Sequence, residues 1–423
     1  MRQVIEMTRR HLRRTGLLAA LAALLAVAAA PARADTVTDW NQIAANVLIG
    51  TAPPLQPPQI TVPHLAMVHG AVYDAVNAID GGHEGYLMSA RVARPTDSQD
   101  AAAAVAAHRV LVRLVPAQQP VLDAQLAASL AAIPDGRSKT RGIAVGEAAA
   151  AAMIAARTDD GRFGTPGFQV GTAPGVWRPV LPAFVNDPNA WLRDVDPFLI
   201  RGSSQFRSAG PSPLTSRRYA RDFEEVRSLG SATNSGRTAD QTLAAQYWAE
   251  NPAVTWNRTF RTLSAQQGLA LVDNARFFAV LYMTATDALI SVWDDKAHWS
   301  FWRPITAIRE ADTDGNARTE PDSGWLPLIP TPPYPEHPSG HTGFSGSIVK
   351  TLQQFFGTDR IGWSDTNAAG TREFTRFSQA IDDVVDARVW SGLHFRNADE
   401  QGEQIGRQVA RYVGQRYFER LRR

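Results

Sequence analysis

The sequence has 423 residues, enough for one large domain or two and for a substantial buried core. It contains no cysteine, which excludes disulfides, thiolate catalysis and cysteine-ligated zinc or iron–sulfur centres. The formal net charge of +2 is too small to indicate a polyanionic partner.

Residues 1–34 have the three parts of an export signal. A basic start is followed by the apolar run "LLAALAALLAVAAA" and by the small residues "ARA" before Asp35. The pair Arg9-Arg10 resembles a twin-arginine signal, and a buried N-terminal helix is the alternative. We therefore expect export to the periplasm or the extracellular space. The twin-arginine route would be used if Arg9-Arg10 is recognised as a twin-arginine signal.

The chain after this segment is slightly acidic. It keeps 37 basic and 40 acidic residues, a formal charge of −3. No basic block suited to nucleic acid or anionic lipid remains, and no further apolar run reaches membrane length. We expect a mature protein with no nucleic-acid partner and no membrane span.

Helical periodicity dominates the rest of the chain. Apolar residues recur at helical spacing over 64–79, alanine-rich segments at 100–115 and 142–157 follow, and residues 271–293 carry a long apolar stripe. Residues 161–240 are rich in Pro, Gly and Trp, and we expect ordered loops there without long helices. The predicted fold is all-α, with packed helical bundles and long ordered loops. We divide it into an N-terminal helical region, 35–240, and a C-terminal catalytic region, 241–423.

Three separated stretches of the C-terminal region carry polar residues in unusual patterns. "WDDKAHWSFWRP" contains Lys296 and Arg303, and "YPEHPSGHTGFSGS" contains Ser339, Gly340 and His341 at a predicted helix start. In the third stretch, "ARVWSGLHFRNADEQG", Arg388 shares an apolar stripe that begins at Phe374.

Their side chains suit one kind of ligand. An inward-facing arginine needs an anion, because an unpaired buried charge is costly. The guanidinium, ammonium and hydroxyl groups, with backbone N–H groups at a helix start, are the donors that an oxyanion with several acceptor oxygens requires. The three stretches therefore predict one oxyanion site.

The three stretches resemble the motifs Lys-x6-Arg-Pro, Pro-Ser-Gly-His and Arg-x5-His of the vanadium-dependent haloperoxidase and type-2 phosphatidate phosphatase superfamily. The resemblance is specific over residues 290–405 and extends loosely to "VHGAVYDAVNAI" and "GVWRPVLPAF", which are similar to bacterial vanadium chloroperoxidase-like proteins. It implies an all-α fold and a vanadate cofactor. The enzyme would oxidise halide with hydrogen peroxide to hypohalous acid, which acts on a small organic acceptor.

The same resemblance implies roles for individual residues. His394 would bind vanadium and His341 would act as acid or base. Lys296 would polarise bound peroxide. The oxyanion-binding residues would be Lys296, Arg303, Ser339, Gly340, Arg388 and His394. Trp293 and Tyr334 occupy positions that line the halide site in family members, although plain core aromatics are an equally good account of both.

A metal-free phosphatase acting on a phosphate ester is the alternative enzyme. His394 would then be the nucleophile and His341 the proton donor. The family often has Ser where this chain has Ala387, and many members place an Asp where this chain has Ala398. Asp399 lies about 100° further around a helix, so this departure mildly disfavours a phosphatase. A non-catalytic phosphate or vanadate binder would need neither histidine.

Other motifs carry less weight. The segment from Asp312 imitates a calcium loop, but its Gly position holds Ala317 and its twelfth position holds Ser323. His64, His69 and His108 sit on helical patterns and fit core or surface positions better than ligand positions. Halide preference, organic substrate and oligomeric state stay open.

Overall fold

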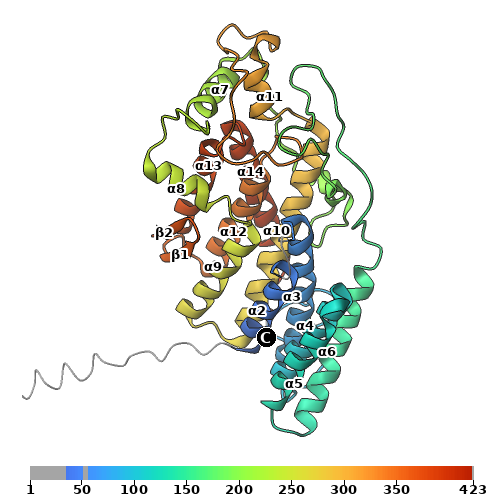
Figure 1. Cartoon of the computed structure of the whole chain (residues 1–423). Coiled ribbons are helices and arrows are strands. Elements are labelled where there is room, and N and C mark those ends of the chain that lie inside the picture. Colours follow the sequence, from blue (N-terminus) through green and yellow to red (C-terminus); the bar gives the residue numbers. More distant parts are fainter. Residues whose placement is uncertain (1–34, 51–55, 422–423) are drawn as a thin grey trace, which may run out of the picture.

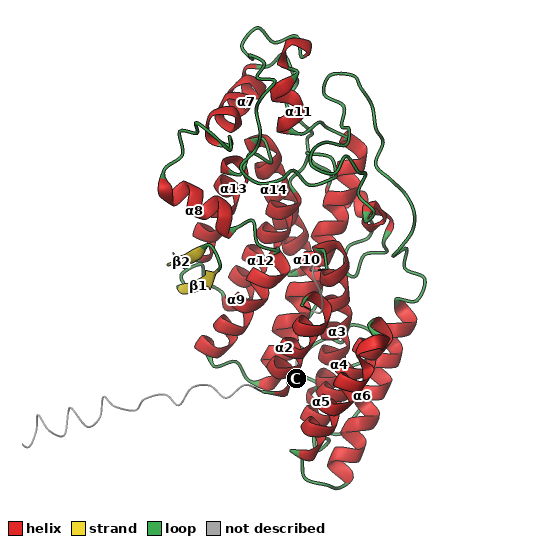
Figure 2. Ribbon diagram, in the orientation of Figure 1, coloured by secondary structure: helices red, strands yellow, loops and turns green. Residues whose placement is uncertain are grey.

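The computed structural model describes residues 35–50 and 56–421, so the predicted export signal lies outside the described residues. Within them the chain is helical apart from one small sheet, which confirms the all-α fold class (Figures 1 and 2). The α-helices of the N-terminal half are α2 (Thr36–Ile49), α3 (Pro58–Asp80), α4 (Gln99–Leu114), α5 (Gln119–Ala131), α6 (Arg137–Ala156) and α7 (Arg217–Leu229).

The C-terminal half contains seven more α-helices and the sheet. The helices are α8 (Ala239–Tyr247), α9 (Pro252–Gln267), α10 (Leu271–Trp299), α11 (Pro304–Arg309), α12 (Gly340–Phe356), α13 (Phe377–Trp390) and α14 (Arg396–Val413). The strands are β1 (Trp363–Asn367) and β2 (Gly370–Phe374), and short 3₁₀ turns occupy η1 (Pro116–Gln118), η2 (Ala190–Asp194), η3 (Ser203–Phe206) and η4 (Ala311–Thr313).

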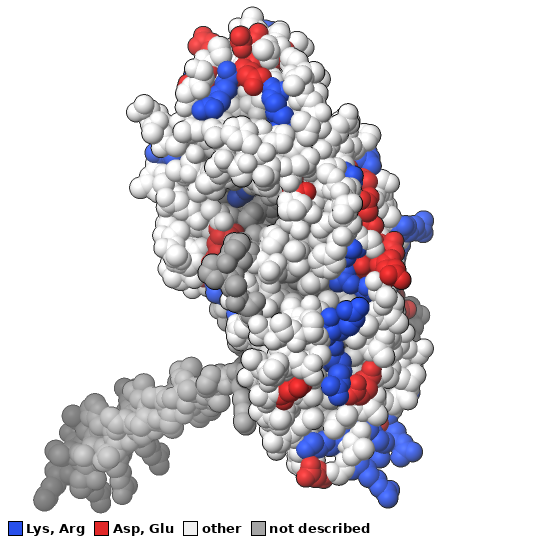
Figure 3. All heavy atoms as spheres, turned by 45° about the vertical axis from the view of Figure 1, so that its right-hand side comes forward, with Lys and Arg blue, Asp and Glu red and all other residues white. Residues whose placement is uncertain are grey.

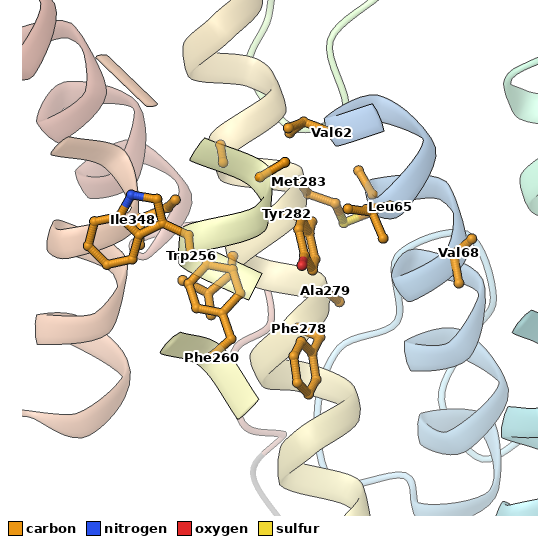
Figure 4. Close-up of a cluster of buried hydrophobic side chains, with 14 of the residues drawn as sticks. Val62, Leu65, Val68, Trp256, Phe260, Phe278, Ala279, Tyr282, Met283 and Ile348 are labelled. Atoms are coloured by element: carbon orange, nitrogen blue, oxygen red, sulfur yellow. The ribbon is translucent and has the colours of Figure 1, made fainter. Parts of the chain in front are cut away.

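Helix α10 lies between the two halves and packs against both. Its side chains meet those of α3 on one side and those of α9 and α12 on the other, as Tyr282, Leu65, Phe260 and Ile348 illustrate (Figure 4). Among the described residues, α10 is the one helix long and apolar enough to cross a membrane, but 94% of its apolar window is buried inside the fold. That burial is typical of a core helix.

The N-terminal helices pack closely because small residues face one another. A Cβ on Gly142 would lie 2.3 Å from the carbonyl oxygen of Ser98, and one on Gly146 would lie 2.5 Å from that of Ala102. The backbone of α6 therefore contacts the alanine-rich face of α4 directly, with no room for a larger side chain between the two helices. The helices predicted over 64–79, 100–115 and 142–157 are all present.

Buried carboxylates of α10 hold the long loop that wraps the bundles. Asp287 accepts hydrogen bonds from the backbone N–H groups of residues 198–200 at 2.7, 2.7 and 2.9 Å. About two turns further along the helix, Asp295 accepts from Ser208 N at 2.8 Å and from Arg207 at 2.9 Å. These bonds satisfy loop N–H groups that burial would otherwise leave unpaired.

Two local expectations were wrong. Helix α7 has 13 residues and lies inside the segment expected to lack long helices. The stripe expected to begin at Phe374 begins instead at Phe377, because Phe374 belongs to strand β2 and pairs with Trp363 of β1. The aromatic pair is stacked, with ring centroids 4.8 Å apart, so Phe374 is buried through a hairpin and not through a helix.

Most of the face drawn in Figure 3 is uncharged, and the positive and negative side chains are intermixed along its right-hand side, without a large field of one sign. This face gives no support to a nucleic-acid partner. The proposed boundary between regions at residue 240 remains a prediction.

Candidate active site

The first stretch spans the end of α10 and the start of α11. Ser300 closes α10 in a left-handed conformation, φ 40°, and its N–H donates to the Lys296 carbonyl at 2.9 Å. Arg303 is the residue before Pro304, which begins α11. The segment from Lys296 to Arg303 thus spans the end of α10, a short turn and the residue before α11. Both side chains are fully buried.

The second stretch is a loop that leads into α12. Ser339 is the residue before this helix, and its own N–H donates to the Ala398 carbonyl at 2.9 Å. A Cβ on Gly340 would lie 2.9 Å from the Trp293 ring, so only glycine fits there. The first N–H groups of α12 have no partner within the helix, and the helix dipole favours an anion at this end.

The third stretch joins α13 to α14. Arg388 lies in the last turn of α13, and His394 precedes α14 by two residues. Both side chains are buried, with Arg388 inward as predicted. The Arg303 Nη1 lies 3.3 Å from His394 Nε2, which joins the first and third stretches directly.

The ammonium of Lys296 donates to three carbonyls of the second stretch. Its Nζ lies 2.7 Å from Pro335 O, 3.0 Å from Glu336 O and 2.6 Å from Pro338 O. Burial and the neighbouring Arg303 lower the pKa of Lys296 well below its usual range. The three hydrogen bonds from Lys296 hold the loop that positions Ser339.

The guanidinium of Arg303 is also held by backbone oxygens. Its Nε donates to Tyr334 O at 2.8 Å and its Nη1 to Leu393 O at 2.9 Å. Burial lowers the pKa of Arg303 to about 10, so the group remains a cation at neutral pH. Hydrogen bonds from two of its three nitrogens thus fix the plane of the guanidinium group.

Several buried polar atoms around this point lack a protein partner. Across residues 35–50 and 56–421, none is found for Arg303 Nη2, Ser339 Oγ, His341 Nε2 or Arg388 Nε. We call Arg303, Ser339, Gly340, His341 and Arg388 the anion cradle. Unpaired buried donors are costly, and a bound oxyanion would satisfy them.

The charge pattern fits an oxyanion and not a free cation. No group of three or more His, Asp or Glu side chains that could hold a metal ion occurs among the described residues. Burial and then Arg303, Lys296 and Arg388 lower the pKa of His394 well below its usual range, so its imidazole is neutral and able to bind a metal. These residues fit vanadate, which combines an oxyanion with a metal that accepts a histidine nitrogen.

Sequence reasoning missed Glu336. Its Oε1 lies 3.1 Å from His394 Nδ1 and accepts the Phe395 N–H at 3.0 Å, and both side chains are buried. Burial raises the pKa of Glu336 to about 8. The only available signal was an acidic residue three positions before Ser339, because its partner is 58 residues away in the chain.

Asp399 is buried nearby but is not the partner of His394. Neither of its carboxylate oxygens has a hydrogen-bond partner in the described part of the chain. Burial raises its pKa well above the usual range, against the opposing influence of Ser339 and Arg388. Its position confirms that the carboxylate partner of His394 does not come from the third stretch.

A pocket of about 350 Å³ opens beside the anion cradle. It is lined by Trp293, Tyr334, Gly340, His341 and Arg388, so it joins the three stretches in one site, with further walls from α3, α9 and the proline-rich loop at 329–332. The rings of Trp293 and Tyr334 are 5.1 Å apart. The structure thus brings the candidate halide-site residues to the same pocket as the cradle.

Comparisons with known proteins agree with this arrangement. Residues 276–422 match the family model for the second helical-bundle domain of vanadium chloroperoxidase, and this range carries all three stretches. The vanadium chloroperoxidase of Curvularia inaequalis is 32% identical over 159 residues, which cover 30% of this chain and 25% of that protein. The sequence match thus spans about a quarter of the length of that curated relative.

Solved structures share the whole fold. A bacterial vanadium-dependent iodoperoxidase superposes with a TM-score of 0.77 at 22% identity, covering 92% of this chain and 96% of that one. The holo form of a bacterial vanadium-dependent chloroperoxidase gives a TM-score of 0.71 at 16% identity, covering 92% and 98%. The domain match covers residues 276–422 with all three motifs, and the solved structures show that the chain has the fold of vanadium-dependent haloperoxidases.

Proposed function

We propose that this protein is a vanadium-dependent haloperoxidase that uses hydrogen peroxide to oxidise halide to hypohalous acid. The observation that carries the proposal is a set of four buried polar atoms without a partner in the described chain, beside a neutral His394: the donors Arg303 Nη2, Ser339 Oγ and Arg388 Nε, and the imidazole nitrogen His341 Nε2. A bound oxyanion would accept from these donors, and the lone pair of His394 Nε2 would be available to its metal.

The residues of the site would have separate roles. Arg303 and Arg388 would neutralise the charge of the oxyanion, Ser339 Oγ and the Gly340 N–H would donate to its oxygens, and His394 Nε2 would bind the metal. Vanadate, when bound, would supply a Lewis acid that activates hydrogen peroxide toward halide without a change of its own oxidation state.

His341 would hold and release a proton at Nε2. This atom is buried and has no partner among the described side chains, while the ring lines the pocket with Arg388. Burial, followed by Arg388, lowers the pKa of His341 well below its usual range, so the resting imidazole can accept a proton. Lys296 would add positive potential, although its donors are occupied by carbonyls in this structure.

The halide and the organic acceptor would enter through the pocket. Trp293 and Tyr334 would contact the halide, and the pocket is large enough for a small organic molecule beside the cradle. The export segment at 1–34 would place the enzyme in the periplasm or outside the cell, where the absence of cysteine removes the side chain most easily oxidised by the product.

A phosphatase is the second candidate, and Glu336 favours it. The sequence disfavoured this activity because no carboxylate was expected beside His394, yet Glu336 lies 3.1 Å from Nδ1. With phosphate ester in the cradle, His394 Nε2 would attack phosphorus and the P–O bond to the alcohol would break. His341, having taken up a proton when the ester binds, would give that proton to the leaving oxygen. Water would then release phosphate from the phosphohistidine.

One preparation of the purified protein can decide between these candidates. Bromide-dependent halogenation is measured with peroxide and added vanadate, and phosphate ester hydrolysis is measured without vanadate. We expect vanadate-dependent halogenation to be the faster reaction. Fast ester hydrolysis with no vanadate-dependent halogenation would replace the first candidate by the second, and binding of both anions without either reaction would leave a non-catalytic binder.

A further inference from the structure

We propose that Glu336 is a positioning residue that fixes the tautomer and ring plane of His394. Its Oε1 lies 3.1 Å from His394 Nδ1, and both side chains are almost wholly buried, so water does not compete for this contact. The inference rests on the proposed function only in the use that it gives to the opposite nitrogen, Nε2.

The neighbours of the imidazole decide which nitrogen carries the proton. Arg303 Nη1 lies 3.3 Å from Nε2, and a guanidinium can only donate. Nε2 must therefore present its lone pair, and the single proton of a neutral ring must be on Nδ1. Glu336 Oε1 is the acceptor that this N–H requires. The ring is thus held from both sides in the one tautomer that leaves Nε2 able to bind a metal or attack phosphorus.

The backbone that carries Glu336 is itself held on both sides. Lys296 donates to the carbonyls of Pro335, Glu336 and Pro338, and the Glu336 N–H donates to Phe301 O at 2.9 Å. The carboxylate also accepts the Phe395 N–H at 3.0 Å, from the residue next to its target. The distance between Glu336 and His394 is therefore set by main-chain contacts from three elements.

A purely structural role for this glutamate is a poor account of its geometry. Its second oxygen, Oε2, is buried and has no hydrogen-bond partner within the described residues, which costs stability. A residue selected only to fill space here would avoid that cost. The carboxyl group lies at the one place where its other oxygen, Oε1, orients an imidazole.

The tautomer can be observed directly in the full-length protein without ligand. Long-range ¹H–¹⁵N spectra of protein labelled with ¹⁵N-histidine distinguish a protonated from an unprotonated ring nitrogen, and His394→Asn identifies the signal of His394 among the nine histidines. We expect the proton on Nδ1 only. A proton on Nε2 in the unsubstituted protein would overturn the inference, whatever any variant does.

Two substitutions at the same position separate orientation from packing. Glu336→Gln keeps an oxygen that can accept from Nδ1–H, whereas Glu336→Leu keeps the volume and removes the acceptor. We expect a single Nδ1–H species in the Gln variant and a mixed or broadened signal in the Leu variant. Glu310→Gln, which alters a carboxylate paired with Arg178 away from the pocket, is the matched control.

Binding supplies the second readout. Inorganic vanadate and inorganic phosphate are titrated calorimetrically into each variant, with folding checked by circular dichroism. We expect the Leu variant to bind vanadate about 10–100-fold more weakly, the usual loss when the partner of a metal-binding histidine is removed. The Gln variant should stay within a few-fold of the original protein. Unchanged vanadate affinity in a folded Leu variant would contradict the inference; if that variant does not fold, the tautomer of the unsubstituted protein decides.

Failure of this inference and failure of the proposed function give different results. Glu336-dependent tautomer and binding without any halogenation would remove the haloperoxidase assignment and leave the positioning role intact. Vanadate-dependent halogenation together with a proton on His394 Nε2 would support the haloperoxidase assignment and remove the positioning role of Glu336.

Discussion

At the scale of single residues, the two histidines of the site should separate under substitution. In the proposed function His394 would provide the nitrogen for the metal, so His394→Ala should abolish tight vanadate binding and halogenation together. His341→Ala leaves that nitrogen and the arginines in place, so vanadate should still bind while the halogenation rate falls about 10²–10⁴-fold. Vanadate titration of folded variants checks both outcomes, and tight binding by His394→Ala would remove His394 from the metal site.

Lys296 should matter for stability as well as for activity. Lys296→Met would leave the carbonyls of Pro335, Glu336 and Pro338 buried without their donor. We expect the free energy of unfolding to fall by about 2–4 kcal/mol. Urea unfolding of this variant beside Lys350→Met, on a partly exposed lysine, measures the difference. Equal stability of the two variants would show that the loop is held without the ammonium.

The sequence predicted most residues of the site but not their contacts. The distinctive local pattern of each stretch predicted five residues that lie together at the candidate site: Arg303, Ser339, His341, Arg388 and His394. Glu336 was overlooked because its role depends on a residue 58 positions away, and no local pattern marks such a contact. The three carbonyl partners of Lys296 were invisible for the same reason, since backbone oxygens leave no trace in a sequence.

At the scale of elements, the crossing of α12 and α14 positions the second and third stretches. A Cβ on Gly402 would lie 2.4 Å from Ser339 O, and one on Gly406 would lie 2.1 Å from Gly343 O. Both helices therefore meet at backbone distance next to the start of α12. Neither contact involves a flexible side chain that could move aside, so the crossing tolerates no added methyl group.

Gly406→Ala should therefore destabilise the protein even though alanine favours helices. In an open helical site this change would gain up to about 1 kcal/mol, whereas here the helices must separate, which we expect to cost about 1–3 kcal/mol. Gly202→Ala is the control, because a Cβ there would meet no described atom within 4 Å. Thermal unfolding compares the two, and a Gly406→Ala protein as stable as the control would contradict the close crossing.

Helices were predicted correctly where apolar residues keep a helical spacing over a long segment. Elements were missed where that spacing is short or interrupted. Helices α3, α4, α6 and α10 follow long apolar stripes and were found. Helix α7 was missed because Pro and Gly on both sides dominate the composition of its segment. The hairpin β1–β2 was missed because each strand has five residues, too few for alternation to be distinguished from a helical stripe.

At the scale of the whole molecule, the sequence predicted helical bundles without their arrangement. The arrangement depends on α10, whose apolar window is 94% buried and which contacts both halves. Its carboxylates also hold the wrapping loop by accepting backbone N–H groups, as Asp287 does for residues 198–200. Such bonds use the carboxylate of one residue and the main chain of another, so loop sequence alone cannot reveal them.

The core also determines how stability responds to acid, and His69 provides a clean test. Its ring stacks on Phe278 and Tyr282 at 5.0 and 5.2 Å, and its Nε2 lies 2.9 Å from Asn41 Nδ2. The amide nitrogen can only donate, so Nε2 must accept and the ring must be neutral. Burial lowers the pKa of His69 from 6.5 to about 3 in the folded protein.

The sign of the effect follows from this depressed pKa. Between about pH 6.5 and pH 3 the unfolded chain carries a proton on His69 that the folded protein lacks, so stability is lost as the pH falls through this window. Other buried groups also titrate there, and His69→Gln removes this one contribution from the difference between two proteins. The unsubstituted protein should lose about 1.4 kcal/mol per pH unit relative to the variant, because one proton is linked to unfolding. Urea unfolding of both proteins at several pH values between 7 and 4 measures this difference, and a difference independent of pH would show that folding does not lower the pKa of His69.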